Sequence, residues 1–154
     1  MGARKRNKLK AYFAFESLSN SADHKFDCNG KLVTDTTANL NFSLLTSPAF
    51  KDLTARQRML YVCAKSEFFG ARSRPKNDFA DDDFKKDGAG LMFYLNHRLV
   101  TDVYGLYPKT NRRDFYKDIE ALVSHGFISR VSNGRVNKQR SIYQYSAAWK
   151  TWRE

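Results

Sequence analysis

The chain has 154 residues and a hydrophobic share of 42%, which predicts one domain that is large enough to bury a core. Its formal net charge of +11 predicts a polyanionic binding partner. No apolar run approaches the ~20 residues of a membrane span, and no long apolar segment follows the charged first residues as in a signal peptide. Cys28 and Cys63 stand far apart without a metal or disulfide pattern, so we expect reduced thiols in a cytoplasmic protein.

Positive charge is concentrated at the two ends of the chain. The first ten residues carry five cations and no acid, residues 11–90 are balanced, and residues 91–154 carry a net charge of +6. Because residues 1–10 have no hydrophobic periodicity, we expect a disordered basic arm that follows phosphates or enters a minor groove; the alternative is a solubilising tail. The cations of the arm are Arg4, Lys5, Arg6, Lys8 and Lys10.

Residues 11–154 are expected to form a single domain with an N-terminal extension. Ala11–Leu18, AYFAFESL, is too apolar for a free tail and is predicted to pack on the domain. Ser19–Leu45 is polar and rich in turn formers, with room for short strands within Lys31–Asn41.

The first clear helix is predicted over Thr54–Phe68. Thr54 and Gln57 form a T-x-x-Q capping box, and Gly70 would end the segment. The spacing of its apolar residues predicts a buried face formed by Met59, Leu60, Cys63 and Ala64.

A long polar segment, Ala71–Gly90, follows this helix and contains Asp78, Asp81, Asp82, Asp83 and Asp87. Its spacing differs from that of an EF-hand loop and no histidine is near, so we expect neither a metal nor another cofactor there, and no enzymatic activity. The alternative is a metal-dependent nuclease. Leu91–Leu95, LMFYL, is predicted to be a short buried strand that pairs with a later hairpin.

Two helices joined by a short turn are predicted next. The first spans Asn96–Tyr104, with Asn96 as N-cap and Gly105 at its end, and it would bury Leu99, Val100 and Val103. The second begins after Pro108, with Thr110 as N-cap, and ends at Gly126. Its apolar face is formed by Phe115, Ile119, Leu122 and Val123.

Polar and basic side chains crowd the start of this second helix. A recognition helix contacts base edges with its N-terminal residues, and Arg, Lys and Asn are the side chains that pair with guanine and adenine. The alternative is a solvated surface helix, which cations near an N-terminus suit poorly. The candidate DNA-binding residues here are Lys109, Thr110, Asn111, Arg112, Arg113, Tyr116 and Lys117.

A β-hairpin is predicted from Phe127–Ser132 and Ser141–Ser146, whose strands are rich in β-branched and aromatic residues. Asn133-Gly134 permits a tight turn, but a longer loop over Asn133–Arg140 would let its cations project together. No acid occurs between Glu120 and Glu154. Such a charge run favours a phosphate-binding wing over a merely solvated face, with Arg130, Arg135, Lys138 and Arg140 as contacts.

Phe50–Tyr61 (FKDLTARQRMLY), the FYL strand and Asp118–Ile128 (DIEALVSHGFI) together resemble the N-terminal domain of plasmid replication initiators of the replication-initiator-A type, over about Ser47–Arg130. The predicted fold is α+β: a winged helix-turn-helix with a three-stranded antiparallel β-wing and a basic N-terminal arm. The resemblance implies origin or operator recognition on a mobile element, with double-stranded DNA, replication or conjugation proteins and a second copy in a homodimer as partners. The alternatives are a transcriptional regulator, a relaxosome factor and an RNA-binding or assembly protein.

Overall fold

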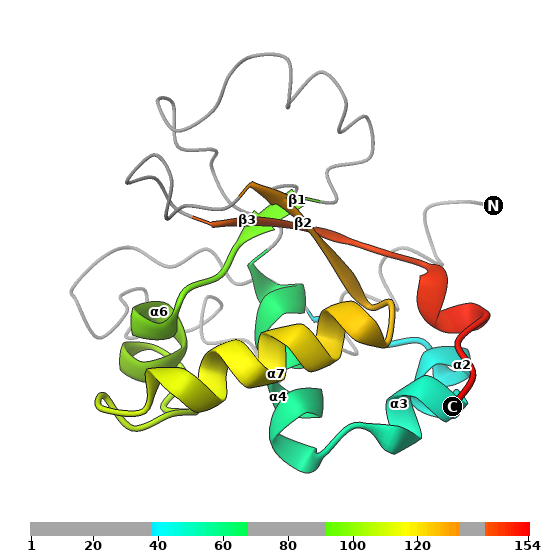
Figure 1. Cartoon of the computed structure of the whole chain (residues 1–154), viewed down its shortest axis with the longest axis horizontal. Helices are drawn as coiled ribbons and strands as arrows, with labels where there is room; N and C mark the ends of the chain where they lie inside the picture. The colour runs from blue at the N-terminus through cyan, green and yellow to red at the C-terminus, as the bar shows by residue number, and fades with distance from the viewer. Residues whose placement is uncertain (1–37, 68–91, 133–140) are drawn as a thin grey trace, which may run out of the picture. The chain divides into compact units, whose positions relative to one another are not determined.

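The computed structural model describes residues 38–67, 92–132 and 141–154, which form an α+β arrangement of helices and one antiparallel sheet (Figure 1). The basic arm, the apolar segment 11–18, the aspartate-rich segment and the hairpin tip lie outside these residues. The elements are α2 (Phe42–Leu45), α3 (Pro48–Asp52), α4 (Ala55–Ser66), β1 (Met92–Tyr94), α6 (His97–Asp102), α7 (Arg112–Ser124), β2 (Ile128–Ser132), β3 (Ile142–Tyr145) and the 3₁₀ helix η3 (Ala148–Lys150).

The sheet has three strands in the order β1-β3-β2, all antiparallel. The prediction that the FYL strand pairs with the hairpin is therefore confirmed, with Phe93 opposite Tyr143. Alternation along the strands places Phe93 in the main core, whereas Met92 and Tyr94 join Ile142 in a second, smaller cluster. The pairing of β2 with β3 shifts register between Arg130 and Ser132, which bends the hairpin locally.

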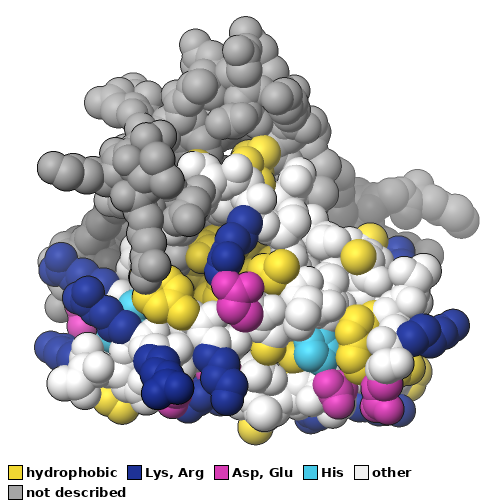
Figure 2. Space-filling model, viewed as in Figure 1, with side chains coloured by type: hydrophobic (Ala, Val, Ile, Leu, Met, Phe, Trp, Pro, Cys, Tyr) yellow, Lys and Arg dark blue, Asp and Glu magenta, His cyan; other side chains and the backbone are white. Residues whose placement is uncertain are grey.

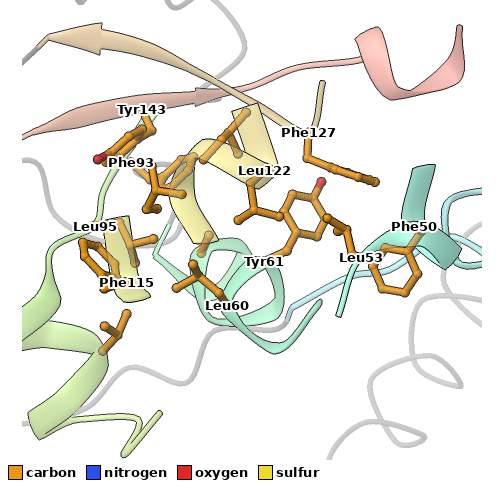
Figure 3. Packing of buried hydrophobic residues seen from close by; sticks show 14 of the residues in the cluster. Phe50, Leu53, Leu60, Tyr61, Phe93, Leu95, Phe115, Leu122, Phe127 and Tyr143 are labelled. Atoms are coloured by element: carbon orange, nitrogen blue, oxygen red, sulfur yellow. The ribbon is translucent and has the colours of Figure 1, made fainter. Parts of the chain in front are cut away.

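The main core lies between α4, α7 and the sheet (Figure 3). Phe115, Ile119 and Leu122 of α7 are fully buried, which confirms the predicted apolar face, and Val123 lies half-buried at its edge. These side chains meet Leu60 of α4, together with the aromatic rings of β1 and β3. Burial of this stripe fixes which face of α7 remains available at the surface.

Two expected core residues are in fact exposed. Met59 is 51% exposed, and Tyr61 takes its place beside Leu60 on the buried face of α4, because about 100° of rotation per residue puts Met59 at the edge of that face. Val103 is 45% exposed because α6 ends at Asp102 and the chain turns away there; only Val100 of α6 is fully buried among its apolar residues.

The N-caps predicted for α4 and α6 are confirmed, whereas α4 ends at Ser66 and α6 at Asp102, each two residues before the predicted end. Thr54 and Gln57 form the capping box, Asn96 Oδ1 accepts the amide of Leu99 at 2.8 Å, and Gly105 and Gly126 both adopt positive φ. The N-cap of α7 is a correction. Asn111, not Thr110, caps this helix, because Asn111 Oδ1 lies where it accepts the amide of Asp114 at 3.2 Å.

The short helices α2 and α3 were not expected from the sequence. Ser47 caps α3 by accepting the Phe50 amide at 3.2 Å, and Pro48 occupies the first helical position. Residues 38–41 contain no strand, and the rest of Lys31–Asn41, where short strands were considered, lies outside the described residues. In the described part of the chain, no helix is long and apolar enough to cross a lipid bilayer.

Candidate nucleic-acid interface

The N-terminal half of α7 presents a cationic face. Arg112, Arg113, Tyr116 and Lys117 are all exposed. Arg113 and Lys117 lie on the side of the helix opposite Phe115 and Ile119, whereas Arg112, seven residues before Ile119, is exposed at the first turn. Figure 2 shows Lys and Arg side chains gathering over α6 and the N-terminal half of α7 on the viewed face. The buried stripe holds the helix by one side, so the cations on the other side point away from the core.

The turn between α6 and α7 carries two further candidates, Lys109 and Thr110, both exposed. The core holds this turn in place, because Tyr107 is buried and packs edge-on against Phe115 with 5.7 Å between ring centroids. His97 Nε2 also lies 3.2 Å from the carbonyl oxygen of Pro108. The turn and the start of α7 therefore form one supported surface.

Asn111 differs from its neighbours because both ends of its side chain contact Asp114. Its Oδ1 accepts the Asp114 amide, and its Nδ2 donates to Asp114 Oδ2 at 2.8 Å. This hydrogen bond from Asn111, followed by the nearby Arg56 guanidinium, lowers the pKa of the Asp114 carboxyl despite partial desolvation. Asn111 thus holds the N-terminus of α7 in place.

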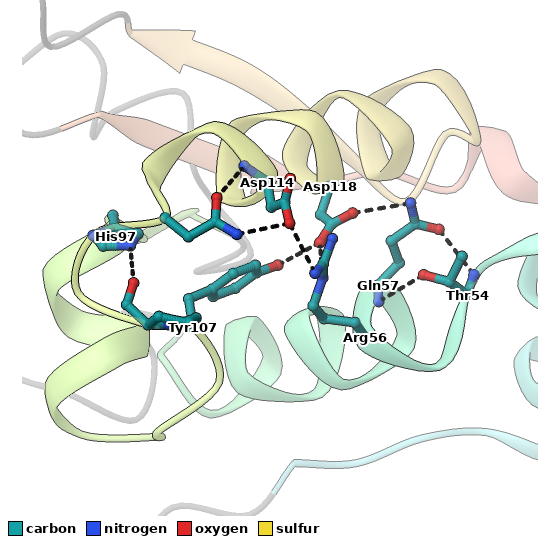
Figure 4. Close-up of polar contacts among 9 residues, drawn as sticks. Thr54, Arg56, Gln57, His97, Tyr107, Asp114 and Asp118 are labelled. Atoms are coloured by element: carbon teal, nitrogen blue, oxygen red, sulfur yellow. Dashed lines mark hydrogen bonds and ion pairs between the residues drawn. The ribbon is translucent and has the colours of Figure 1, made fainter.

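A polar network fixes α7 against α4 (Figure 4). The buried Asp118 carboxylate accepts from Arg56 Nε at 2.6 Å, from Gln57 Nε2 at 3.1 Å and from the Tyr107 hydroxyl at 2.7 Å. The hydrogen bond to Asp118 raises the pKa of Arg56, which keeps its charge in this pair. Gln57 connects the network to the capping box, since its Oε1 accepts the Thr54 amide.

Sequence reasoning missed this network, although one signal pointed to it. Asp118 is three residues after Phe115 and directly before Ile119, so the helical period places a carboxylate at the edge of the apolar face. A carboxylate at such a position needs donors from another element. The pattern does not say which element supplies them.

A recess of about 330 Å³ lies between α7 and the hairpin. Arg113, Tyr116 and Glu120 line it from α7, Arg130 and Ser132 line it from β2, and Tyr143 of β3 and Ser141 just before β3 complete the lining. Arg130 pairs with Glu120 across the recess, so this predicted wing residue lies beside the predicted recognition helix. Burial raises the pKa of the Tyr143 hydroxyl, although Arg130 and Ser141 act in the opposite direction.

The structure brings Arg113, Tyr116 and Arg130 to one recess, with Arg112 and Lys117 on the adjoining face of α7. Arg135, Lys138, Arg140 and the five cations of the arm lie outside the described residues. The aspartates considered for a metal also lie outside them. Among the residues that the structure does describe, no group of three or more His, Cys, Asp or Glu side chains is placed to hold a metal ion.

Comparison of the chain with protein-family models, with curated proteins and with solved structures gives no match in any of the three. The functional interpretation therefore rests on the residues and their geometry.

Proposed function

We propose that this chain binds double-stranded DNA as a winged helix-turn-helix module and that α7 is its recognition helix. The observation that supports this most is the exposed face formed by Arg112, Arg113, Tyr116 and Lys117 at the N-terminal half of α7. Recognition helices contact base edges with their N-terminal residues, and the major groove is wide enough to admit one α-helix.

The order of the elements supports the same proposal. An α-helix (α4), a short strand (β1), two helices joined by a turn (α6 and α7) and a hairpin (β2 and β3) follow one another, and β1 pairs with the hairpin. This is the arrangement expected of a winged helix-turn-helix, in which the hairpin lies beside the recognition helix. The recess lined by Arg113 and Arg130 lies between α7 and the hairpin.

The side chains divide into three roles in this proposal. Arg112 pairs with a guanine edge, because a guanidinium can donate two parallel hydrogen bonds to O6 and N7, whereas Arg113 lines the recess beside the hairpin and contacts phosphate. Lys109 and Lys117 contact phosphates as point charges. Asn111 does not contact bases but holds the start of α7, since its amide group is bound to Asp114.

A binding-site selection from random duplexes, followed by fluorescence anisotropy on the selected and a scrambled duplex, tests the proposal. The double variant Arg112→Ala/Arg113→Ala is expected to lose discrimination between the duplexes by about 1–3 kcal/mol for each base contact removed. The matched control is Lys51→Ala/Arg153→Ala, which removes two exposed cations from other elements and should weaken both duplexes slightly and equally.

Three outcomes contradict parts of the proposal. Equal losses on both duplexes would mean that Arg112 and Arg113 contact only phosphates. Tighter binding of a duplex RNA competitor than of any DNA would favour recognition of A-form shape. Failure of the wild-type chain to bind any duplex at moderate salt would overturn DNA binding itself.

A further inference from the structure

Glu120 is the one carboxylate among the exposed residues of α7. The remaining exposed residues of α7 are Arg112, Arg113, Tyr116, Lys117 and Ser124. Its oxygen Oε1 accepts a hydrogen bond from Arg130 of β2, inside the recess between helix and hairpin. A carboxylate therefore occupies the place at which a cationic surface would receive an external anion.

The composition of the recess suits a phosphate group. Arg113 and Arg130 line it from two different elements, and Ser132 at the end of β2 and Ser141 just before β3 add polar side chains beside them. A guanidinium offers donors in a fork that matches two phosphate oxygens, and such charge-assisted bonds are stronger than neutral ones. A group held from α7 and the hairpin together would also fix the hairpin against the helix.

The pair between Glu120 and Arg130 can open at little cost. Their side chains are 58% and 41% exposed, and ion pairs between solvated side chains contribute little to stability. Arg130 is also part of a strand, so its backbone position does not depend on Glu120. Release of the carboxylate would leave the guanidinium in the recess.

We propose that the recess binds one phosphodiester group of the DNA backbone through Arg113 and Arg130, and that Glu120 occupies Arg130 until this phosphate displaces it. The inference rests on the proposed function for the source of the phosphate. Glu120 is then a built-in competitor that weakens binding to every duplex, because any nucleic-acid backbone must displace it. Neutralising Glu120 strengthens binding without a change in sequence preference.

Titration with inorganic phosphate at constant ionic strength tests the recess without DNA. The Nε–Hε resonance of Arg130 is followed by NMR in the wild-type chain and in Glu120→Gln, which keeps the shape of the side chain. The resonance should shift in both, with an apparent dissociation constant about two- to fivefold lower in the variant, as expected for release of a solvated ion pair. Absence of a shift in both proteins would overturn the phosphate site, and equal constants would overturn the competition by Glu120.

A double-mutant cycle on duplex DNA then tests the competition. Glu120→Gln should tighten binding about two- to fivefold on selected and scrambled duplexes alike, and this gain should vanish in an Arg130→Gln background. Arg130→Gln alone should flatten the salt dependence by about one unit. The matched control Asp102→Asn neutralises an exposed acid that pairs with an arginine of its own helix, Arg98 of α6, and it should change affinity less than about twofold.

The outcomes separate the two proposals. If Glu120→Gln gives the same gain with and without Arg130, the carboxylate acts only through overall charge and the competition is wrong. If Asp102→Asn strengthens DNA binding as much as Glu120→Gln does, the competition by Glu120 is likewise wrong. If no variant binds any duplex while Arg130 still responds to phosphate as expected, DNA binding is overturned and the phosphate site in the recess stands.

Discussion

The carboxylate of Asp118 accepts a hydrogen bond of 2.6 Å from Nε of Arg56, which is 62 positions earlier in the chain. Asp118 is 2% exposed, whereas the Arg56 side chain is 41% exposed at the surface of α4. This pair joins the N-terminal turn of α4 to the middle of α7. The Tyr107 hydroxyl donates to the same carboxylate and so connects the turn before α7 to it. It therefore fixes the rotation of α7 and, with it, the direction of the cationic face.

Asp118→Ala should lower the free energy of unfolding by about 3 kcal/mol, because Gln57 and the buried Tyr107 hydroxyl lose their acceptor and Arg56 loses its counter-charge. The estimate is at the low end for a broken buried pair, since water reaches Arg56. Urea denaturation followed by tryptophan fluorescence measures it. Asp102→Ala, which breaks an exposed pair with Arg98, should cost less than ~1 kcal/mol, and equal costs would contradict the importance of burial.

Asp114 should make the stability depend on pH. Its pKa in the folded chain lies below the ordinary value of 3.8, chiefly because Asn111 donates a hydrogen bond to it. Its contribution to stability is therefore fully present above the unfolded pKa and is lost as the pH falls through the folded pKa. The gap in unfolding free energy between the wild-type chain and Asp114→Asn should shrink as the pH falls from about 5 to about 2.

The cause of this pH dependence can be checked in an Asn111→Ala background. Removal of the Asn111 amide raises the pKa of Asp114 toward its ordinary value. The difference in unfolding free energy between Asn111→Ala and Asn111→Ala/Asp114→Asn should therefore change less with pH than the difference between the wild-type chain and Asp114→Asn. An unchanged pH profile in this background would mean that Arg56, and not Asn111, dominates the shift.

Gly126 and Gly105 offer a matched pair of substitutions, because both have positive φ but different surroundings. A Cβ at Gly126 would lie 2.6 Å from the backbone nitrogen of Trp149, whereas at Gly105 nothing lies within 4 Å. Gly105→Ala should cost about 1–2 kcal/mol of backbone strain. Gly126→Ala should cost roughly 3 kcal/mol or more, because displacement of η3 adds to the strain. Equal shifts in thermal midpoint would show that η3 moves without cost.

Arg135, Lys138 and Arg140 are predicted to contact phosphates at a flanking groove. Their joint replacement by alanine should weaken binding and reduce the salt dependence by about two to three units, at roughly 0.9 for each lost phosphate contact. The fold should survive, which circular dichroism can verify. The triple variant Lys51→Ala/Lys150→Ala/Arg153→Ala removes the same charge from exposed residues outside α6 and α7 and should leave the slope nearly unchanged. Normal binding by the first variant would exclude the hairpin tip as a DNA contact.

Most helix ends in the described residues were predictable from the sequence, because capping is a local interaction. Thr54 and Gln57 are three residues apart, as are Asn96 and Leu99, so the hydrogen bonds between them form whenever the chain enters a helix at that point. Gly126 follows the same logic, since positive φ costs little only for glycine. The apolar stripe of α7 likewise follows from the helical period.

The tertiary structure alone decided which of several good local candidates is used. Thr110 and Asn111 are both suitable caps, and the contact of Asn111 with Asp114 and, through it, Arg56 selects the second. Met59 and Tyr61 are both apolar, and the packing of Tyr61 on Phe127 decides that Met59 faces outward. The pairs Arg56–Asp118 and Glu120–Arg130 bring together different elements. A periodic pattern along one segment defines the face of a helix but not the neighbour that covers it, because that neighbour is supplied by a distant part of the chain.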